Sequence, residues 1–221
     1  MFGEINLEEN NNYEKWCEEW RKKFLKLNQE ELKKKLPELE EEGDWLLIRH
    51  FGRKLGVHKE DGTIEALEDQ EPLTCYERLN VYTLFGYVYP LAHYKNEWVK
   101  FDKLKDTAPF AGAFRKGIIE PFSRMFACHT KELAEACEKL GGTRLPWSDT
   151  GYELKAFECI PVRFLFWEGD EEFPAQGNIL FDASATDFIH GESVVTIAVI
   201  GLMRLANLAG IAMDRSAFPV F

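Results

Sequence analysis

The sequence lacks closely spaced cysteines. Its five cysteines are scattered, the nearest two lie nine positions apart, and neither a CxxC pair nor the ligand spacing of a zinc site occurs. An odd number of dispersed cysteines is typical of reduced thiols rather than of a disulfide framework. We therefore expect a cytoplasmic protein with reduced, mostly buried thiols at Cys17, Cys75, Cys128, Cys137 and Cys159.

An excess of positive charge is also missing. The chain has 27 Lys and Arg against 38 Asp and Glu, which gives a formal net charge of −11. Nucleic-acid binding needs a basic face that releases counterions from phosphates, and an anionic membrane surface attracts the same kind of face. The composition therefore predicts neither nucleic acid nor a membrane surface as a partner.

No segment has the pattern of a secretory signal or a membrane span. The first residues lack the basic start and apolar run of a signal peptide. The most apolar stretch, Val194–Met213, is interrupted by Arg204 and Asn207. Its uninterrupted part is about ten residues long, whereas a bilayer needs about 20. We interpret this stretch as a buried helix.

The common catalytic motifs are absent as well. The chain has no GxSxG elbow, no GxGxxG or GxxxxGK[ST] phosphate loop, and no HExxH pair. Each of these motifs places a nucleophile, a phosphate cradle or a metal where the chemistry requires it. The sequence therefore has none of the motifs that usually indicate a hydrolase or a nucleotide-dependent enzyme.

What the chain does have is enough material for one well-packed domain. It contains 221 residues, 45% of them hydrophobic, with 17 Phe and 6 Trp. A chain of this length can bury a sizeable core without disulfides or metals. The many aromatic residues indicate an aromatic core or an aromatic-lined pocket.

The first 44 residues are predicted to be mainly helical. Apolar residues spaced alternately by four and three positions draw one stripe along a long amphipathic helix: Tyr13, Cys17, Trp20, Phe24 and Leu27. Asn28 followed by Glu31 has the form of a capping box and predicts a second short helix up to Leu36. We expect residues 1–44 to form a helical extension packed on a single domain of residues 45–221.

The remaining chain mixes strands and helices. Gly52 is expected to bend a strand into a hairpin, and Thr74 to cap a helix that ends before Pro90. Residues Ala108–Arg124 are predicted to form two short helical pieces separated near Gly117. Thr130 is predicted to cap the next helix. Strands are predicted at Glu97–Phe101, Tyr152–Phe157, Val162–Trp167 and Asn178–Phe181.

The predicted fold class is therefore α+β. Short connections between consecutive strands favour a mainly antiparallel sheet. Helices would pack on this sheet, with a long amphipathic helix at the amino terminus and an apolar helix from Ser193 to Gly210 at the carboxyl terminus. Gly201 in the last helix would allow the close approach of a neighbour.

The candidate site lies between Ile160 and Glu192. Asp170, Glu172, Asp182 and Glu192 could converge with His190 and bind a hard divalent ion, for which carboxylate oxygens are suitable ligands. The alternative is structural: Asp182 could cap the helical piece Ala183–Phe188, Glu192 could lie in the first turn of the last helix, where the dipole favours an anion, and the acids from Asp170 to Glu172 could form a solvated turn. Divalent metal is thus a possible cofactor, with Asp170, Glu172, Asp182 and His190 as candidate ligands.

Apolar and cationic groups extend this candidate site. Trp167 and Phe173-Pro174 frame the acidic turn, so a carboxylate there could have a raised pKa. Arg53 and Arg115 could clamp an anion, or each could pair with one of the many acids. We include Trp167, Arg115 and Arg53 with the acids as candidate ligand-binding residues.

Three functions remain open from these observations. The first is a non-catalytic ligand-binding or accessory domain with its site beside Asp170, Glu172 and Asp182. The second is a metal-dependent enzyme that uses the acidic residues. The third is a protein-interaction module that docks through the stripe of Trp16, Trp20 and Phe24. The partner could accordingly be a small molecule or a protein.

Several motifs, taken in order, are similar to those of one known family. They are Phe51-Gly52-Arg53, Glu97–Phe101, Ala113-Phe114-Arg115, Leu140-Gly141-Gly142, Phe166–Ala175 and Ile179–Ala185. In this order they resemble the domain-of-unknown-function family 3786, over about residues 45 to 208. The resemblance implies a soluble domain of anaerobic bacteria and archaea, sometimes joined to an iron–sulfur module, with no assigned activity. No such cysteine module occurs here.

Overall fold

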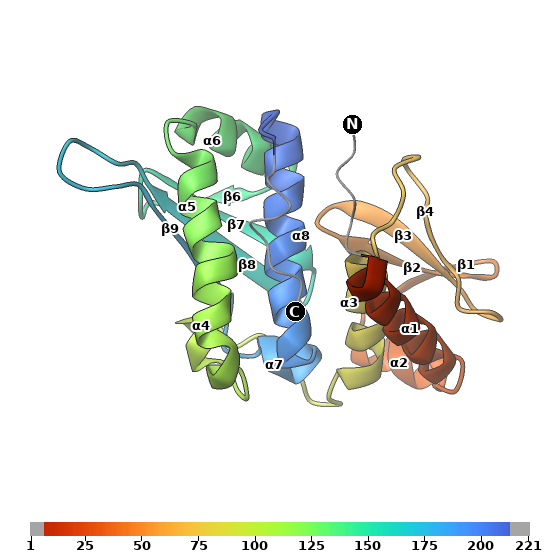
Figure 1. Ribbon diagram of the computed structural model, residues 1–221. Helices are drawn as coiled ribbons and strands as arrows, with labels where there is room; N and C mark the ends of the chain where they lie inside the picture. Colours follow the sequence, from red (N-terminus) through yellow and green to blue (C-terminus); the bar gives the residue numbers. More distant parts are fainter. Residues whose placement is uncertain (1–6, 213–221) are drawn as a thin grey trace.

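The computed structural model describes residues 7–212, with side chains from residue 14 onward. The fold is α+β, as predicted: helices pack against two antiparallel sheets (Figure 1). The strand orders are β1-β2-β3-β4 in the first sheet and β5-β9-β8-β7-β6 in the second.

The first sheet and its helices come from the amino-terminal part of the chain. The strands are β1 (Glu40–Glu42), β2 (Trp45–His50), β3 (Arg53–His58) and β4 (Ile64–Ala66), and the helices are α1 (Leu7–Phe24), α2 (Gln29–Lys35) and α3 (Cys75–Tyr87). Because β1 pairs with β2, residues before 45 contribute a strand as well as two helices. The predicted boundary at residue 44 stays a prediction.

Local signals set the ends of these elements. The Asn28 side chain accepts the N–H of Glu31 at the start of α2, and Thr74 forms a complete capping box with Glu77 at the start of α3. Phe51 and Gly52 both have positive φ, 46° and 77°, in the two-residue turn between β2 and β3. Positive φ at both central residues matches the twist of a tight hairpin, so the predicted bend at Gly52 is a turn.

The second sheet carries the rest of the chain. Its strands are β5 (Trp98–Lys100), β6 (Thr143–Arg144), β7 (Thr150–Phe157), β8 (Ile160–Trp167) and β9 (Gln176–Asp182). The short 3-10 helices η1 (Phe101–Lys103) and η2 (Ala108–Phe110) follow β5. The other helices are α4 (Ala111–Phe114), α5 (Glu120–Phe126), α6 (Thr130–Lys139), α7 (Ala185–Phe188) and α8 (Gly191–Ala209).

Two predicted helix boundaries were wrong. Residues 111–126 form one continuous helical run, because a π-helical turn, η3 (Arg115–Ile119), joins α4 to α5 where a break near Gly117 was expected. A π turn absorbs the extra residue without ending the helix. Thr130 is the first residue of α6 and not its cap, since His129 occupies the cap position. The Thr130 carbonyl instead accepts the Thr150 hydroxyl.

Helix α8 lies across the second sheet, beside the run from α4 to α5, and α3 lies on its other side (Figure 1). It is long and apolar enough to span a membrane, but more than half of it is buried in the protein. One contiguous core extends from Phe24 of α1 to Ala206 of α8. The α1 residues Trp20 and Phe24 pack into their own domain, where Trp20 contacts Tyr87 and Phe24 contacts Phe85.

Gly201 brings both sheets against α8. A Cβ atom at this position would lie 2.6 Å from Phe164 Cζ in β8 and 2.9 Å from Phe51 Cζ in the first hairpin. Both rings are almost fully buried. The absent side chain therefore allows the close approach of the two aromatic rings at this junction.

We expect Gly201→Ala to lower the free energy of unfolding by about 1–3 kcal/mol, because the rings have no space to retreat. Chemical denaturation monitored by circular dichroism measures the change. Gly112→Ala is the matched control, since a Cβ there meets nothing within 4 Å, and it should leave stability equal or higher. Equal stability of the Gly201 variant and the wild type would contradict the tight packing.

Candidate binding cleft

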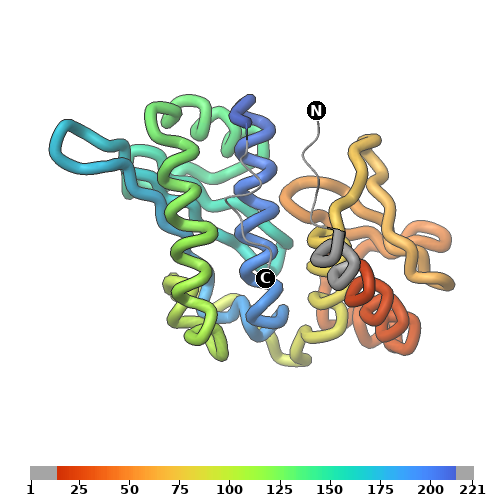
Figure 2. The backbone as a smooth tube through the Cα atoms, in the orientation of Figure 1, coloured from red at the N-terminus to blue at the C-terminus, as the bar shows by residue number. Residues whose placement is uncertain are grey.

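A cleft of about 920 Å³ opens between the helical run α4–η3 and the end of the second sheet. One side consists of residues from β5, η1, α4 and η3, and the other of residues from β8, β9 and their connection. Figure 2 shows that this connection, residues 168–175, extends as an arm from the body of the molecule. The cleft lies at the base of the arm.

Stacked aromatic rings form one wall. Phe101 of η1 and Phe114 of α4 lie parallel, with centroids 4.2 Å apart and an interplanar angle of 6°. Phe181 of β9 meets both rings edge-on. All three residues are almost fully buried. Trp167 and Phe173, by contrast, line the cleft with 39% and 63% of their surface exposed, so the opposite wall is apolar and accessible.

Two cationic residues border the same cleft. Lys100 ends β5, and Arg115 begins the π-helical turn. The Arg115 side chain is 70% exposed, and its Nε lies 3.9 Å from Glu120 Oε1, at the limit of an ion pair. Ile119, at the other end of the π turn, also lines the cleft. Such turns occur frequently at functional sites.

Asp170 and Glu172 of the arm do not line this cleft, whereas Glu168 at its base does. Asp170 is exposed, and its Oδ1 accepts the N–H groups of Glu172 and Phe173, both at 2.8 Å. These hydrogen bonds lower the pKa of Asp170, and the one from Phe173 has the largest effect. Glu172 is exposed beside it. Trp167 and Phe173-Pro174 therefore frame an ionised turn residue. The prediction that a carboxylate between them has a raised pKa is wrong for Asp170.

Asp182 is almost fully buried at the end of β9. Its carboxylate accepts the N–H groups of Lys95 and Glu97 at 3.0 Å each and both the N–H and the hydroxyl of Ser184. Burial alone raises the pKa of this carboxyl, but the hydrogen bonds outweigh it and the net pKa is lowered. Asp182 thus ties two loops together, while Ser184 takes the cap position of α7.

The other candidate residues lie elsewhere. His190 caps α8, where its Nδ1 accepts the N–H of Glu192 at 3.3 Å, and Glu192 lies in the first turn. Arg53 is 5% exposed and paired with Asp69 and Glu77. Arg53 therefore belongs to a buried ion pair, which is the pairing alternative and not the anion clamp.

Among the residues that the structure describes, no three His, Cys, Asp or Glu side chains are arranged to hold a metal ion. The four acids and His190 thus lie in three separate places. Asp170 and Glu172 are in the turn of the arm, Asp182 holds two loops, and His190 and Glu192 are at the start of α8. Of the candidate ligand-binding residues, Trp167 and Arg115 share the cleft with Phe173, and the others do not line it.

Sequence reasoning missed several residues of the cleft, among them Lys100, Phe101, Phe114 and Ile119. They lie about 50 to 80 positions from the arm in sequence, and the pairing of β5 with β9 and the packing of α4 and η3 on β9 bring them to it. The one local signal is the succession of small and aromatic residues before Arg115, which is compatible with many helices.

A family model described as a domain of unknown function (DUF3786) matches residues 30–203. This match covers most of the chain. The chain belongs to the DUF3786 family. No curated protein and no solved structure matches it.

The DUF3786 region contains every residue that lines the cleft, since these residues run from Lys100 to Ile179. Helix α1 precedes the region. The cleft is accordingly built by the family domain alone.

Proposed function

We propose that this chain is a non-catalytic ligand-binding domain whose cleft takes an organic anion with an apolar body. The observation that carries the proposal is the joint presence of aromatic walls and two cationic side chains around one cavity of about 920 Å³. Pockets for small ligands typically have volumes of about 300–1,000 Å³, mostly apolar walls and a few placed polar groups.

Charge supports the choice of an anion. Two cations, Lys100 and Arg115, and two acids, Asp102 and Glu168, border the cleft. Both acids have partners of their own, because Glu168 accepts the N–H groups of Cys128 and Gly169 and Asp102 lies 3.5 Å from Lys103 Nζ. Arg115, by contrast, is only weakly paired. A guanidinium presents several N–H donors that suit carboxylate, sulfonate or phosphate groups. Asn178 and Gln176, which also line the cleft, supply amide groups for the polar part of such a ligand.

We place this function in the cytoplasm. All five cysteines are free, and burial raises the pKa of the Cys137 thiol to about 12. Buried thiols of this kind are inert. A reducing compartment suits them.

The aromatic sulfonate 8-anilinonaphthalene-1-sulfonate is a suitable probe, because it joins an anionic group to apolar rings. We expect its fluorescence to rise saturably with the wild-type protein. Arg115→Ala should weaken the affinity several-fold through loss of a charge-assisted hydrogen bond, and Trp167→Ala should weaken it through loss of an apolar wall. Fluorescence titration measures both changes.

Arg124→Ala is the matched control. Arg124 is an exposed arginine on the same continuous helix but does not line the cleft, so its removal should leave the affinity unchanged. Wild-type affinity in both the Arg115 and the Trp167 variants would refute the proposal.

A further inference from the structure

A second, smaller cavity of about 230 Å³ lies where α1, α3 and the start of α8 meet. These helices adjoin one another in Figure 1, away from the arm and its cleft. Because α1 precedes the DUF3786 region, this cavity combines a helix of this chain with the family domain. Its volume is below the usual range of about 300–1,000 Å³ for ligand pockets and so suits only a very small ligand.

Aromatic rings form its walls. Trp16 and Trp20 come from α1 and Tyr87 from α3. The Trp20 and Tyr87 centroids are 5.3 Å apart, and Tyr87 in turn lies 5.0 Å from the His190 ring. Trp20 reaches this position because Gly86 has no side chain: a Cβ there would lie 2.5 Å from Trp20 Cζ3.

The Trp20 ring already attracts an ammonium group. The Nζ atom of Lys23 lies 3.7 Å from its centroid. The face of an indole ring attracts cations through its quadrupole, and the attraction increases where water is excluded. Because Lys23 already covers this face of Trp20, the rings that line the cavity serve the apolar part of a ligand.

The floor of the cavity offers hydrogen-bond acceptors. The Thr83 hydroxyl donates to the Leu79 carbonyl at 2.7 Å, and the Ser193 hydroxyl donates to Thr83 Oγ1 at 3.0 Å. Thr196 donates its hydroxyl to Asn80 Oδ1 and to the Ser193 carbonyl. Each hydroxyl hydrogen is thus committed within the protein, and only oxygen lone pairs remain for a ligand. Such a floor selects N–H donors.

The charges at the cavity have the matching sign. Glu19 and Glu192 both line it and are exposed. The start of a helix normally attracts anions through unpaired N–H groups. At α8, however, His190 accepts the N–H of Glu192 with its ring and those of Ser193 and Val194 with its carbonyl. The Glu192 carboxylate also offsets the partial positive charge at this helix start.

We infer that this cavity binds a small protonated alkylamine, with its apolar part between Trp16, Trp20 and Tyr87 and its ammonium group on the hydroxyl oxygens and carboxylates. Isopentylammonium is a suitable probe at pH 7, and isopentanol is its neutral counterpart of similar shape. We expect line broadening of the ligand methyl resonances in NMR titrations with isopentylammonium and much weaker binding of isopentanol.

Variants separate this site from the cleft. Trp16→Ala should weaken isopentylammonium binding roughly 3- to 30-fold, because it removes part of the wall that contacts the apolar part of the ligand, and Glu19→Gln, a change at the surface, should weaken it through lost charge. Trp147→Ala is the control, since Trp147 is exposed to a similar degree outside the cavity. Arg115→Ala should also leave this binding unchanged. Equal affinity for isopentanol, or wild-type affinity in both the Trp16 and Glu19 variants, would overturn the inference.

Discussion

Arg53→Ala should lower the free energy of unfolding by about 3–5 kcal/mol, the usual cost of removing one partner from a buried ion pair. The Arg53 Nη1 atom lies 2.9 Å from Glu77 Oε1, and both side chains are at most 5% exposed. Without Arg53, Glu77 would keep only the hydrogen bonds of its capping box with Thr74. Its charge would be buried and unpaired.

The electrostatics of Arg53 support this expectation. Burial lowers the pKa of the guanidinium, but the hydrogen bonds and charges of Asp69 and Glu77 outweigh burial and raise it. Two further N–H groups of Arg53 meet the Asp69 carboxylate at 2.6 and 2.8 Å, and its Nη2 donates to the Glu71 carbonyl. Arg53 therefore joins β3, the segment after β4, and α3.

Arg49→Ala is the matched control on the same hairpin. Arg49 also makes a two-point pair, with Glu68, but both side chains are about half exposed. Because water screens such pairs, their loss has little effect on stability. Urea denaturation of both variants gives the comparison. Equal losses of unfolding free energy in the Arg53 and Arg49 variants would show that burial of the Arg53 ion pair does not matter for stability.

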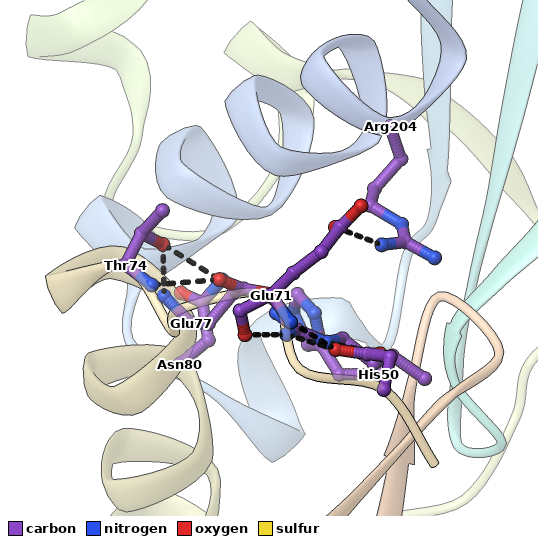
Figure 3. A network of polar contacts seen from close by, with 8 residues as sticks. His50, Glu71, Thr74, Glu77, Asn80 and Arg204 are labelled. Carbon is purple, nitrogen blue, oxygen red and sulfur yellow. Dashed lines mark hydrogen bonds and ion pairs between the residues drawn. The ribbon is translucent and has the colours of Figure 1, made fainter. Parts of the chain in front are cut away.

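The ion pair belongs to a larger polar network between the first sheet and α8. Figure 3 shows Arg204 of α8 directed toward Glu71, and Glu77 beside Thr74. The Arg204 Nη1 atom lies 3.5 Å from Glu71 Oε2, and Thr196 donates to Asn80. Polar contacts thus connect α8 to α3 and to the loop before α3, beside the apolar contacts around Gly201.

Short-range signals were sufficient for much of the fold. The cap of α2 and the capping box of α3 each depend on residues within four positions of one another. Strands β7, β8 and β9 follow from β-branched and aromatic runs joined by short connections. Antiparallel pairing of such runs is a local consequence of the turns.

Long-range relations were not predictable in the same way. The burial of Arg53 depends on partners 16 and 24 residues away, and nothing in its neighbourhood distinguishes it from the exposed Arg49. The π turn at Arg115–Ile119 likewise has no signal in the sequence pattern. Sequence periodicity differs too little between an α-helix and a single π turn to reveal it.

The candidate site shows the same division. Trp167 and Phe173 could be proposed from their neighbours, because both frame the acidic turn, and both line the cleft. The acids beside them were attractive for the same reason, yet Asp170 and Asp182 direct their oxygens to nearby N–H groups. Short acidic side chains often satisfy the backbone in turns, so proximity in sequence does not bring them to a common point.

The network also contains His50, which is almost fully buried among aromatic rings. Its Nε2 lies 3.2 Å from Asn80 Nδ2, so the amide donates and the ring proton is on Nδ1. Nδ1 is buried and has no hydrogen-bond partner among the described residues. Burial lowers the pKa of His50 to about 4; Glu77 opposes this change, and Arg204 and Arg53 add to it.

The protein should consequently lose stability as the pH falls from about 6.5 to 4. In the unfolded chain His50 takes up a proton near its ordinary pKa of about 6.5, whereas the folded protein resists protonation until about pH 4. Because the unfolded state binds more protons in this interval, the free energy of unfolding falls by about 1.4 kcal/mol per pH unit, about 3 kcal/mol in total.

Urea denaturation of the wild type and of His50→Gln at pH 7, 6 and 5 tests this expectation. The glutamine oxygen can still accept the Asn80 amide, but the side chain does not titrate. The stability difference between the two proteins should therefore shrink, or shift in favour of the variant, with each step toward acid. Parallel curves for the two proteins would mean that His50 takes up its proton as easily in the folded protein as in the unfolded chain.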